Sequence, residues 1–369
     1  MSVTSEESPG VLYHRHRRRL STARRSADVL LPVVLVASGV TASAAARAAP
    51  GGWWLTELTV AVVVTELACL AHRIVFDWLV DVRLDRRASR ISPSGAGFLV
   101  ASALRWVTGA ALLVSLGALV IGLARFTAWW PAAIWLLAGT ATGLIGLAWQ
   151  SPLSQLGQPI EPVTDAAALA VVVELTATAG LGSVPVLMTP CCGSPMQESA
   201  HISGVGRRRR VVVSADVVAG EPEALRAVLA HELAHWRCRH RWWAAVMALA
   251  ELAVVLVLLR LLAGESLADP TTFPLWASVA SVLATTASLG GAWLSRAQEL
   301  VADQMGARLV GSADLAARVL AGQSQKLGVE PSPPRWAQLW SPYPPLARRL
   351  QLLELAQAGL EHDRRPRST

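Results

Sequence analysis

The stretch VLAHELAHWRCRH at residues 228–240 contains the pattern H-E-x-x-H. On a helix, positions i and i+4 lie on one face, so His231 and His235 can present their imidazoles to a single metal ion. Glu232 follows the first histidine and lies in range to act as a general base, because zinc lowers the pKa of a bound water towards neutrality. The same pattern also arises by chance from ordinary histidines at a helix end. The prediction of a zinc (Zn2+) site therefore needs a third ligand.

A candidate third ligand lies far along the chain, in SRAQELVADQMGA at residues 295–307. Glu299 and Asp303 are again four residues apart and share a helix face. Glu299 would complete a His2Glu ligand set, which leaves the fourth position of a catalytic zinc open to water. Asp303 would accept a hydrogen bond from a ligand histidine and fix its tautomer. The competing interpretation is a solvated helix face on which these carboxylates pair with Arg296.

The composition indicates a membrane protein. Hydrophobic residues make up 53% of the 369 residues and charged residues only 16%, and the apolar residues gather in long runs. Each run is close to the roughly 20 residues that cross a bilayer core, which predicts six spans. Tryptophans stand at the ends of the runs, where aromatic belts lie. The runs are 29–49, 55–76, 97–124, 128–149, 242–263 and 273–294, the third interrupted by Arg105.

The distribution of arginines predicts the orientation in the membrane. Basic residues gather in the N-terminal tail, the 83–90 loop, the RRRR stretch at 207–210 and the C-terminal tail with RRPR. With six spans all four segments lie on one side, which the positive-inside rule makes cytoplasmic. The end of the first run, TASAAARAA, also offers sites of the kind at which signal peptides are cleaved, whereas the long region before it favours a retained anchor. The orientation of the remaining spans is the same in both cases.

The net charge of +7 invites a nucleic-acid-binding interpretation. The arginines lie at the ends of apolar runs, however, and no stacking or groove-reading motif accompanies them, so we expect no nucleic-acid partner. The expected partners are a polypeptide substrate and the lipid bilayer, and the sequence leaves the oligomeric state open. The cysteines show no C-x-x-C spacing, and we expect them to be reduced, structural thiols. They are Cys69, Cys191, Cys192 and Cys238.

The predicted fold class is mainly α: a polytopic helical membrane protein of about six spans with a cytoplasmic α+β zincin-like catalytic domain. Acidic residues just after Gly220 suit the positive end of the helix that carries H-E-x-x-H. The other elements expected in the water-facing parts are a helix at 164–178, strands near 184–188, 199–203 and 209–214, and C-terminal helices broken by the proline-rich segment 331–345.

The predicted organisation follows the chain in five segments. They are a disordered basic tail (1–27), a four-span membrane region (28–150), a catalytic segment with the H-E-x-x-H helix (151–241), a two-span hairpin (242–294) and a C-terminal helical segment with the third ligand (295–369).

These residues carry a family resemblance. HELAH followed by a distant E-x-x-A-D resembles the integral-membrane peptidase family M48, whose types are the CAAX prenyl protease and the bacterial heat-shock membrane protease HtpX. The similarity extends over roughly residues 160–241 and 290–355, with SAHISGVGRRRRVVVSADVV similar to an edge strand and the strand after it. SPYPPLARRL at 341–350 resembles a late S-H-P-P-x-x-x-R-I segment of the family. The resemblance implies a membrane-embedded zinc metalloendopeptidase.

The chain departs from the family pattern at two places. Ser199-Ala200 replaces the Asn-Ala that commonly begins the edge strand, although the backbone of this strand can still pair with an extended substrate. His201 lies on the same strand, either in contact with substrate or as a plain surface residue. Tyr343 replaces the usual histidine of the late motif, and its phenol could still donate to an oxyanion. Arg349 matches the family arginine.

Other interpretations stay open at this point. One is a zinc-binding membrane sensor, non-catalytic or of the signalling type related to the penicillin-sensor metallopeptidases. Another is a transporter with incidental histidines. His240 lies off the predicted ligand face, which favours a role at the membrane surface. Glu66 and Glu251 fall within spans, where a carboxylate either lines a cavity or is buried with a hydrogen-bonding partner.

Overall fold

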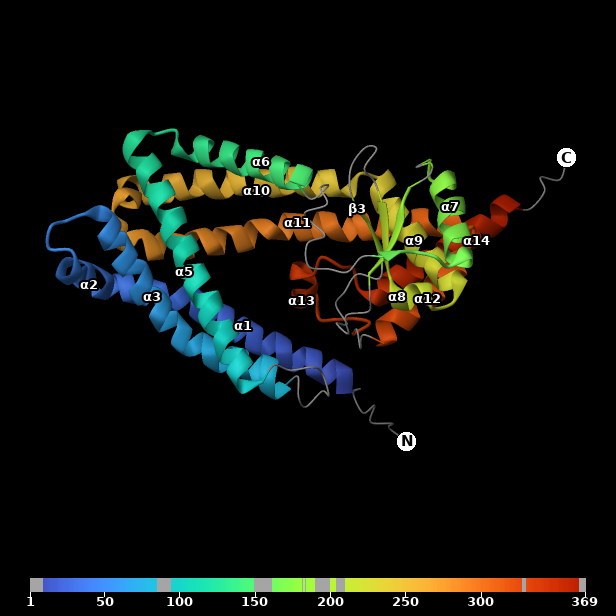
Figure 1. Cartoon of the computed structure of the whole chain (residues 1–369), viewed down its shortest axis with the longest axis horizontal. Coiled ribbons are helices and arrows are strands. Elements are labelled where there is room, and N and C mark those ends of the chain that lie inside the picture. The colour runs from blue at the N-terminus through green and yellow to red at the C-terminus, as the bar shows by residue number, and fades with distance from the viewer. Residues whose placement is uncertain are drawn as a thin grey trace. The chain divides into compact units, whose positions relative to one another are not determined.

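The structure is a computed structural model that describes residues 9–84, 94–148, 161–180, 182, 184–189, 200–203, 210–326 and 330–364. Most of these residues are helical, as predicted. The chain forms two compact units (Figure 1). The first contains residues 1–138 and 249–288, and the second contains residues 139–248 and 289–369.

The first unit is built of long helices. Helix α3 (Trp54–Asp77) continues as a π-helical segment, η1, over Trp78–Leu84 and packs against α5 (Gly95–Phe126). The other elements are α1 (Pro9–Ala37), α2 (Val40–Ala48), the first half of α6 (Trp130–Ala148), most of α10 (His240–Ala263), the short 3-10 helices η4 (Gly264–Ala268) and η5 (Pro270–Thr272), and the start of α11 (Phe273–Val310).

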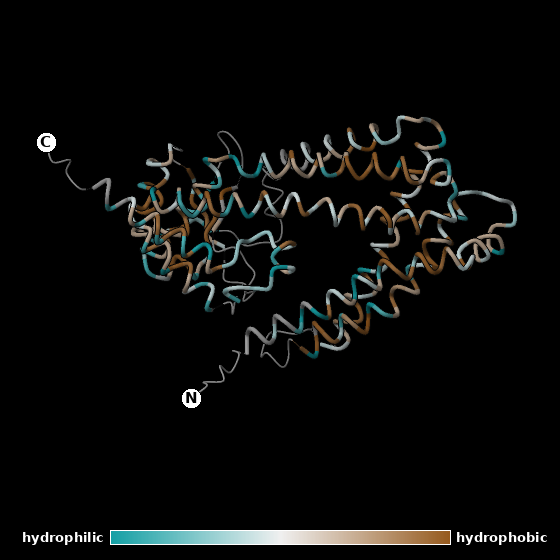
Figure 2. The backbone as a smooth tube through the Cα atoms, turned by 180° about the vertical axis from the view of Figure 1, so that it is seen from behind, coloured by the Kyte–Doolittle hydropathy of each residue, from teal (hydrophilic) through white to brown (hydrophobic). Residues whose placement is uncertain are grey.

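Several of these helices can cross a membrane. Figure 2 shows their long hydrophobic stretches. By length and composition four helical stretches of the described residues qualify, and a fifth arises if Arg19–Ala37 and Val40–Ala48, bent by 63°, form one broken span. The four are Trp54–Leu84, Gly95–Phe126, His240–Ala268 and Pro270–Val310. The predicted polytopic membrane protein is confirmed, and the count of six spans is approximate. The run predicted at 128–149 forms α6.

The basic N-terminal segment is helical. The prediction of a disordered tail over 1–27 is wrong for residues 9–27, which form the first turns of α1. Arginine, leucine and alanine are good helix formers, and ion pairs join this helix to α3. Arg24 pairs with Asp77, and Asp28 accepts a 2.6 Å hydrogen bond from Arg73 Nε. Residues 1–8 lie outside the described part of the chain.

Close packing of α5 against its neighbours depends on a glycine. Leu58, Val62, Ile121 and Phe273 form a buried cluster contributed by α3, α5 and α11. A Cβ atom at Gly117 would lie 3.0 Å from both Leu58 and Phe273. The absent side chain therefore lets α5 approach the cluster without displacing it.

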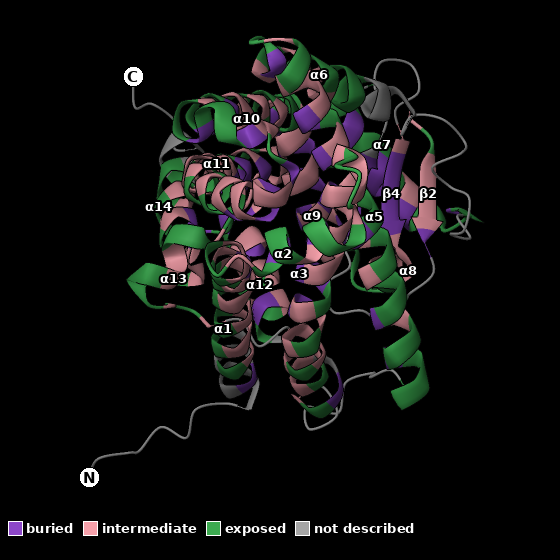
Figure 3. Ribbon diagram, turned by 90° about the vertical axis from the view of Figure 1, so that its left-hand side faces the viewer, coloured by how far each residue is buried: buried purple, intermediate pink, exposed green. Residues whose placement is uncertain are grey.

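The second unit contains a small mixed sheet. Its order is β1-β2-β4-β3, with β2 and β4 parallel and the two outer pairs antiparallel. The central strand β4 is buried along its middle three residues (Figure 3). The strands are β1 (Glu161–Pro162), β2 (Val186–Thr189), β3 (Ala200–Ser203) and β4 (Arg210–Ser214). Three of these were predicted from the sequence, whereas β1 is too short to leave a pattern.

Helices complete the core of this unit. Leu175, Val211, Leu229 and Leu233 belong to one buried cluster, which joins α7 and α9 to the sheet. Helix α7 (Ala166–Thr178) begins at Asp165, whose side chain accepts a hydrogen bond from the Ala168 amide. The other helices are α8 (Ala215–Val218), α9 (Pro222–Arg237), the end of α11, α12 (Ala313–Lys326), α13 (Arg335–Trp340) and α14 (Leu346–Arg364).

The proline-rich segment is not a simple break. It contains the six-residue helix α13, which starts directly after Pro334. Arg296 of α11 donates hydrogen bonds to the carbonyl oxygens of Gln338, Leu339 and Ser341, at 2.8–3.2 Å. The Gln338 carbonyl also accepts a 3.3 Å hydrogen bond from the Ser341 amide. The guanidinium adds to this capping of the helix end and stabilises a helix that is short for its own stability.

Candidate metal centre

Helix α9 brings H-E-x-x-H to the site. Pro222 occupies its first turn and Glu223 follows, both favourable at a helix N-terminus. Leu225, Leu229 and Leu233 recur at four-residue spacing and are at most 2% exposed, so one side of the helix faces the core. The two histidines of the motif therefore project from a helix that is fixed in orientation.

The structure brings His231, His235 and Glu299 together. The two histidine Nε2 atoms lie 3.1 Å apart. The Glu299 carboxylate lies 3.7 Å from His231 Nε2 and 3.3 Å from His235 Nε2. One potential ligand atom from each residue lies within 4.8 Å of the other two. Two imidazoles and one carboxylate are the donor set of a catalytic zinc site, so these residues fit that metal.

A glycine allows α11 to approach α9 this closely. A Cβ atom at Gly306 would lie 3.1 Å from both the Cα and the backbone nitrogen of His231. Any larger side chain would push the two backbones apart. Gly306 lies seven residues after Glu299, about two helical turns along the same face, so it sets the separation between the third candidate ligand and the first histidine.

Asp303 contacts the other side of the first imidazole. Its Oδ1 lies 3.1 Å from His231 Nδ1. Arg349 of α14 donates two hydrogen bonds of 2.7 Å to the Asp303 carboxylate, and its NH2 lies 3.3 Å from Glu299. Glu299 and Asp303 are only 8% and 7% exposed, and Arg296 binds α13 instead. The interpretation as a solvated helix face does not describe these carboxylates.

Burial and charge act in opposite directions on His231 and Arg349. Burial lowers the pKa of His231, but its hydrogen bond to Asp303 and the charges of Asp303, Glu299 and Glu232 raise the pKa above its usual value. Burial likewise lowers the pKa of Arg349, and its hydrogen bonds with Asp303 raise it above its usual value. Without metal, the carboxylates thus stabilise the doubly protonated form of His231, and a metal ion must displace the proton on Nε2 to bind.

His240 lies at the site, which the sequence analysis missed. Its Nδ1 lies 2.9 Å from His235 Nδ1, and the residue is only 7% exposed. The expectation that His240 lies off the ligand face is wrong, because it assumes one continuous helix; a role at the membrane surface stays a prediction. Helix α9 ends at Arg237, and Arg239 adopts a positive φ of 55°, which turns the chain and places His240 at the start of α10. The left-handed backbone conformation of Arg239 is uncommon for a residue other than glycine, so the sequence gives no indication of this turn.

The candidate substrate strand is an edge strand. β3 pairs with β4 on one side, and Arg241 donates a 3.0 Å hydrogen bond to the Ile202 carbonyl oxygen. Ala200 is 2% exposed and His201 pairs in register with Val212. Ser199 lies outside the described residues.

Two other candidate residues have less direct contacts. Tyr343 is 60% exposed. Its backbone amide donates to the Ser341 hydroxyl, which holds the turn after α13. Glu232 is half-buried on α9 beside the first histidine.

Comparisons with known proteins agree with this geometry. The sequence model of peptidase family M48 matches residues 170–356, just over half of the chain, which confirms the predicted family resemblance. The crystal structure of Ste24p from S. mikatae is similar, with a TM-score of 0.68 and 15% sequence identity, over 96% of this chain and 91% of that chain. At this identity the likeness shows the fold alone. A comparison with curated protein sequences gives no match.

Proposed function

Because the chain belongs to peptidase family M48 and is a membrane metalloprotease, we propose that its metal is zinc, held by His231, His235 and Glu299. The observation that carries the ligand assignment is the convergence of these three side chains from α9 and α11. Two imidazoles and a carboxylate leave one position of a tetrahedral zinc open, as hydrolysis requires. We assign the outer contacts to Asp303, which orients His231, and to Arg349, which holds Asp303.

In this proposal Glu232 is the general base. A zinc ion held by these residues would polarise the substrate carbonyl and lower the pKa of a water molecule. Glu232 takes the proton of the attacking water and delivers it to the leaving amine. Asp303 keeps the Nδ1 proton of His231 in place, so that Nε2 is free for the metal. The proposed role of Tyr343 is to donate a hydrogen bond to the oxyanion, which requires its exposed ring to turn towards the bound substrate.

We further propose that the polypeptide substrate binds in an extended conformation beside β3. The strand is the last of the described strands in the sheet and packs against α9. The sequence Ser199-Ala200-His201, whose last two residues lie in β3, resembles the start of the family's edge strand. Strand addition would use backbone hydrogen bonds, which accept many sequences. The arginine distribution supports a cytoplasmic location for this site. A reporter that works only in the cytoplasm should therefore be active when it is fused after residue 369, and a reporter that works only outside the cytoplasm should be inactive there.

The experiment that tests the catalytic assignment is Glu232→Gln in the purified protein. This variant should keep stoichiometric zinc and lose about 100- to 10,000-fold in the rate of cleavage of unfolded casein. Glu174→Gln is the matched control, since exposed Glu174 pairs with half-buried Arg226 on the same unit and its substitution should leave cleavage unchanged.

The outcomes separate the alternatives. A zinc-loaded wild-type protein that cleaves nothing, including itself, would support the non-catalytic sensor. A purified protein without stoichiometric zinc would support incidental histidines. Equal cleavage by wild-type protein and Glu232→Gln would remove Glu232 from the mechanism.

A further inference from the structure

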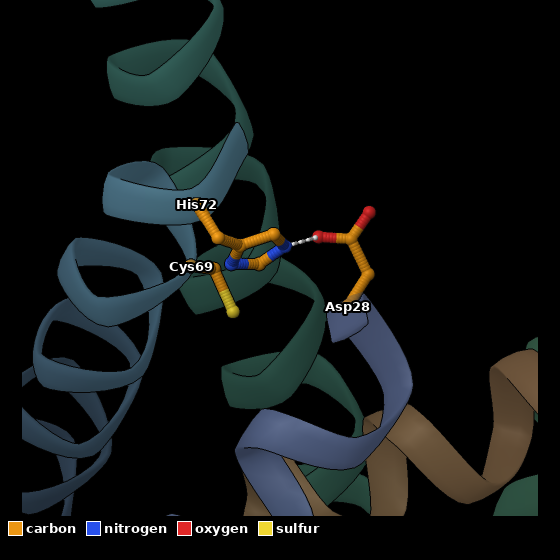
Figure 4. A group of neighbouring side chains, drawn as sticks. All are labelled: Asp28, Cys69 and His72. Atoms are coloured by element: carbon orange, nitrogen blue, oxygen red, sulfur yellow. Dashed lines mark hydrogen bonds and ion pairs between the residues drawn. The ribbon is translucent and has the colours of Figure 1, made fainter. Parts of the chain in front are cut away.

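A second group of potential metal ligands lies in the first unit, outside the proposed peptidase site. Cys69 and His72 are three residues apart on one side of α3, and Asp28 comes from α1, which packs against it. One potential ligand atom from each lies within 4.8 Å of the other two. Figure 4 shows Asp28 at one edge of the His72 ring and the Cys69 sulfur on the side of the other ring nitrogen.

The two nitrogens of His72 differ in their partners. Nε2 lies 3.0 Å from Asp28 Oδ1. Nδ1 is buried and has no hydrogen-bond partner among the described residues. Cys69 is 0% exposed and its thiol is free. A buried ring nitrogen left unpaired beside a buried thiol calls for an explanation, and a bound ion is one that satisfies both atoms.

The charges around this group limit which ion it can hold. Among the described residues, the ion pairs of this region join carboxylates and guanidiniums in equal number, so these side chains together are close to neutral. They are Arg24–Asp77, Arg24–Asp28, Arg73–Asp28, Arg73–Glu66 and Arg105–Asp77. An uncompensated charge within a membrane-spanning helix is costly. If the Cys69 thiol loses its proton to solvent and its sulfur bonds a monovalent cation, the total charge does not change.

We propose that Cys69 Sγ and His72 Nδ1 bind a soft monovalent cation, copper(I), between them. Thiolate is a soft ligand that selects copper(I). Asp28 accepts the Nε2–H of His72 and orients the ring, as carboxylates do behind ligand histidines. A divalent zinc ion would leave one positive charge uncompensated and would need more donors than a thiolate and one imidazole.

The test is anaerobic titration of the full-length, zinc-loaded protein with copper(I) in competition with a coloured copper(I) chelator. Wild-type protein should bind one equivalent, and X-ray absorption at the copper edge should show one sulfur and one nitrogen neighbour. Cys69→Ser and His72→Gln should each weaken binding at least about 100-fold, and Asp28→Asn about 10- to 100-fold. The matched control combines Cys191→Ser, Cys192→Ser and Cys238→Ser, and it should bind copper(I) as the wild type does.

Three results would overturn the proposal. Wild-type protein could bind no copper(I), or Cys69→Ser could bind it equally well. Alternatively, an extra equivalent of zinc that Cys69→Ser loses, with no copper(I) bound, would show a divalent site and contradict the charge argument. If Asp28→Asn does not fold, the test still stands on Cys69→Ser, which exchanges one atom. Protease activity is measured separately, so failure here leaves the peptidase proposal untouched.

Discussion

The two histidine clusters of this protein share one arrangement and differ in what completes it. In the second unit, His231 contacts Asp303, which Arg349 holds through two hydrogen bonds. In the first unit, His72 contacts Asp28, which an arginine of α3 holds through one hydrogen bond. In both clusters a carboxylate fixed by a guanidinium occupies one ring nitrogen. This leaves the other nitrogen as the candidate metal ligand.

The difference lies on the other side of each ring. The Nε2 atom of His231 faces a second imidazole and the carboxylate of Glu299, a set that carries one negative charge and suits a divalent ion. The Nδ1 atom of His72 has no hydrogen-bond partner among the described residues, and the Cys69 sulfur lies on its side of the ring (Figure 4). Two clusters with the same supporting contacts can thus differ in metal class, because the remaining donors decide charge and softness.

Of the changes considered, removal of the Glu299 charge should have the largest effect on metal binding. Glu299→Gln loses the negative charge that suits the second-unit cluster to a divalent ion. Zinc affinity should fall by more than the roughly 100-fold expected for an outer contact, and casein cleavage should fall with it. Competition with a fluorescent zinc chelator measures the first effect. Unchanged zinc affinity in Glu299→Gln, with Glu174→Gln as control, would show that Glu299 is not a ligand.

Removal of Arg349 tests the arrangement that the two clusters share, a carboxylate held by a guanidinium behind a histidine. Arg349→Met leaves Asp303 and Glu299 as buried carboxylates without their guanidinium, at a cost of about 3–5 kcal/mol in the metal-free protein. Bound zinc should reduce this loss, since it supplies positive charge. Thermal unfolding with and without chelator measures both, and exposed Arg348→Met is the matched control.

Removal of Arg73, the corresponding arginine of the first unit, should destabilise the protein less than removal of Arg349. Glu66, which is 7% exposed, also pairs with Arg73 at 2.7 Å, so this substitution is made in a Glu66→Gln background. In that background Arg73→Met leaves Asp28 with Arg24 at 3.7 Å, and the Asp28 side chain is 23% exposed. Its thermal midpoint should therefore fall less than that of metal-free Arg349→Met. An equal or larger fall of the thermal midpoint in Arg73→Met would show that Asp28 depends on its arginine at least as much as Asp303 does.

The separation of α9 and α11 offers a smaller and purely steric test. Gly306→Ala places a methyl group 3.1 Å from the His231 backbone, and overpacking of this kind costs about 1–3 kcal/mol. Zinc affinity should also fall, because Glu299 moves away from the histidines. Gly322→Ala in α12 is the control, since nothing lies within 4 Å of its added Cβ and alanine favours a helix. A normal zinc site in Gly306→Ala would mean that α11 can shift without cost.

The sequence predicted the second-unit cluster because its pattern is regular. His231 and His235 share one helix face at a spacing of four, and so do Glu299 and Asp303, so periodicity within each helix indicated one site. The apolar runs likewise predicted long helices. Asp28, by contrast, falls at the edge of a segment whose charge suggested disorder, and only the packing of α1 on α3 brings it to His72. Contacts between separate helices leave no periodic signal in a single chain.

His240 shows the same limit within the predicted site and leads to the smallest of these effects. Its Nδ1 atom lies against His235 Nδ1 as Asp303 lies against His231, so each histidine of the proposed ligand set has an outer partner. A neutral imidazole is a weaker acceptor than a carboxylate.

His240→Phe, which keeps a ring but removes the acceptor, should weaken zinc binding about 10-fold, the lower end of the range for such contacts. His240→Gln keeps an amide oxygen and should restore part of the affinity. Equal affinity in His240→Phe and wild type would show that His235 holds its tautomer without help, and that only one of the two histidines needs an outer partner.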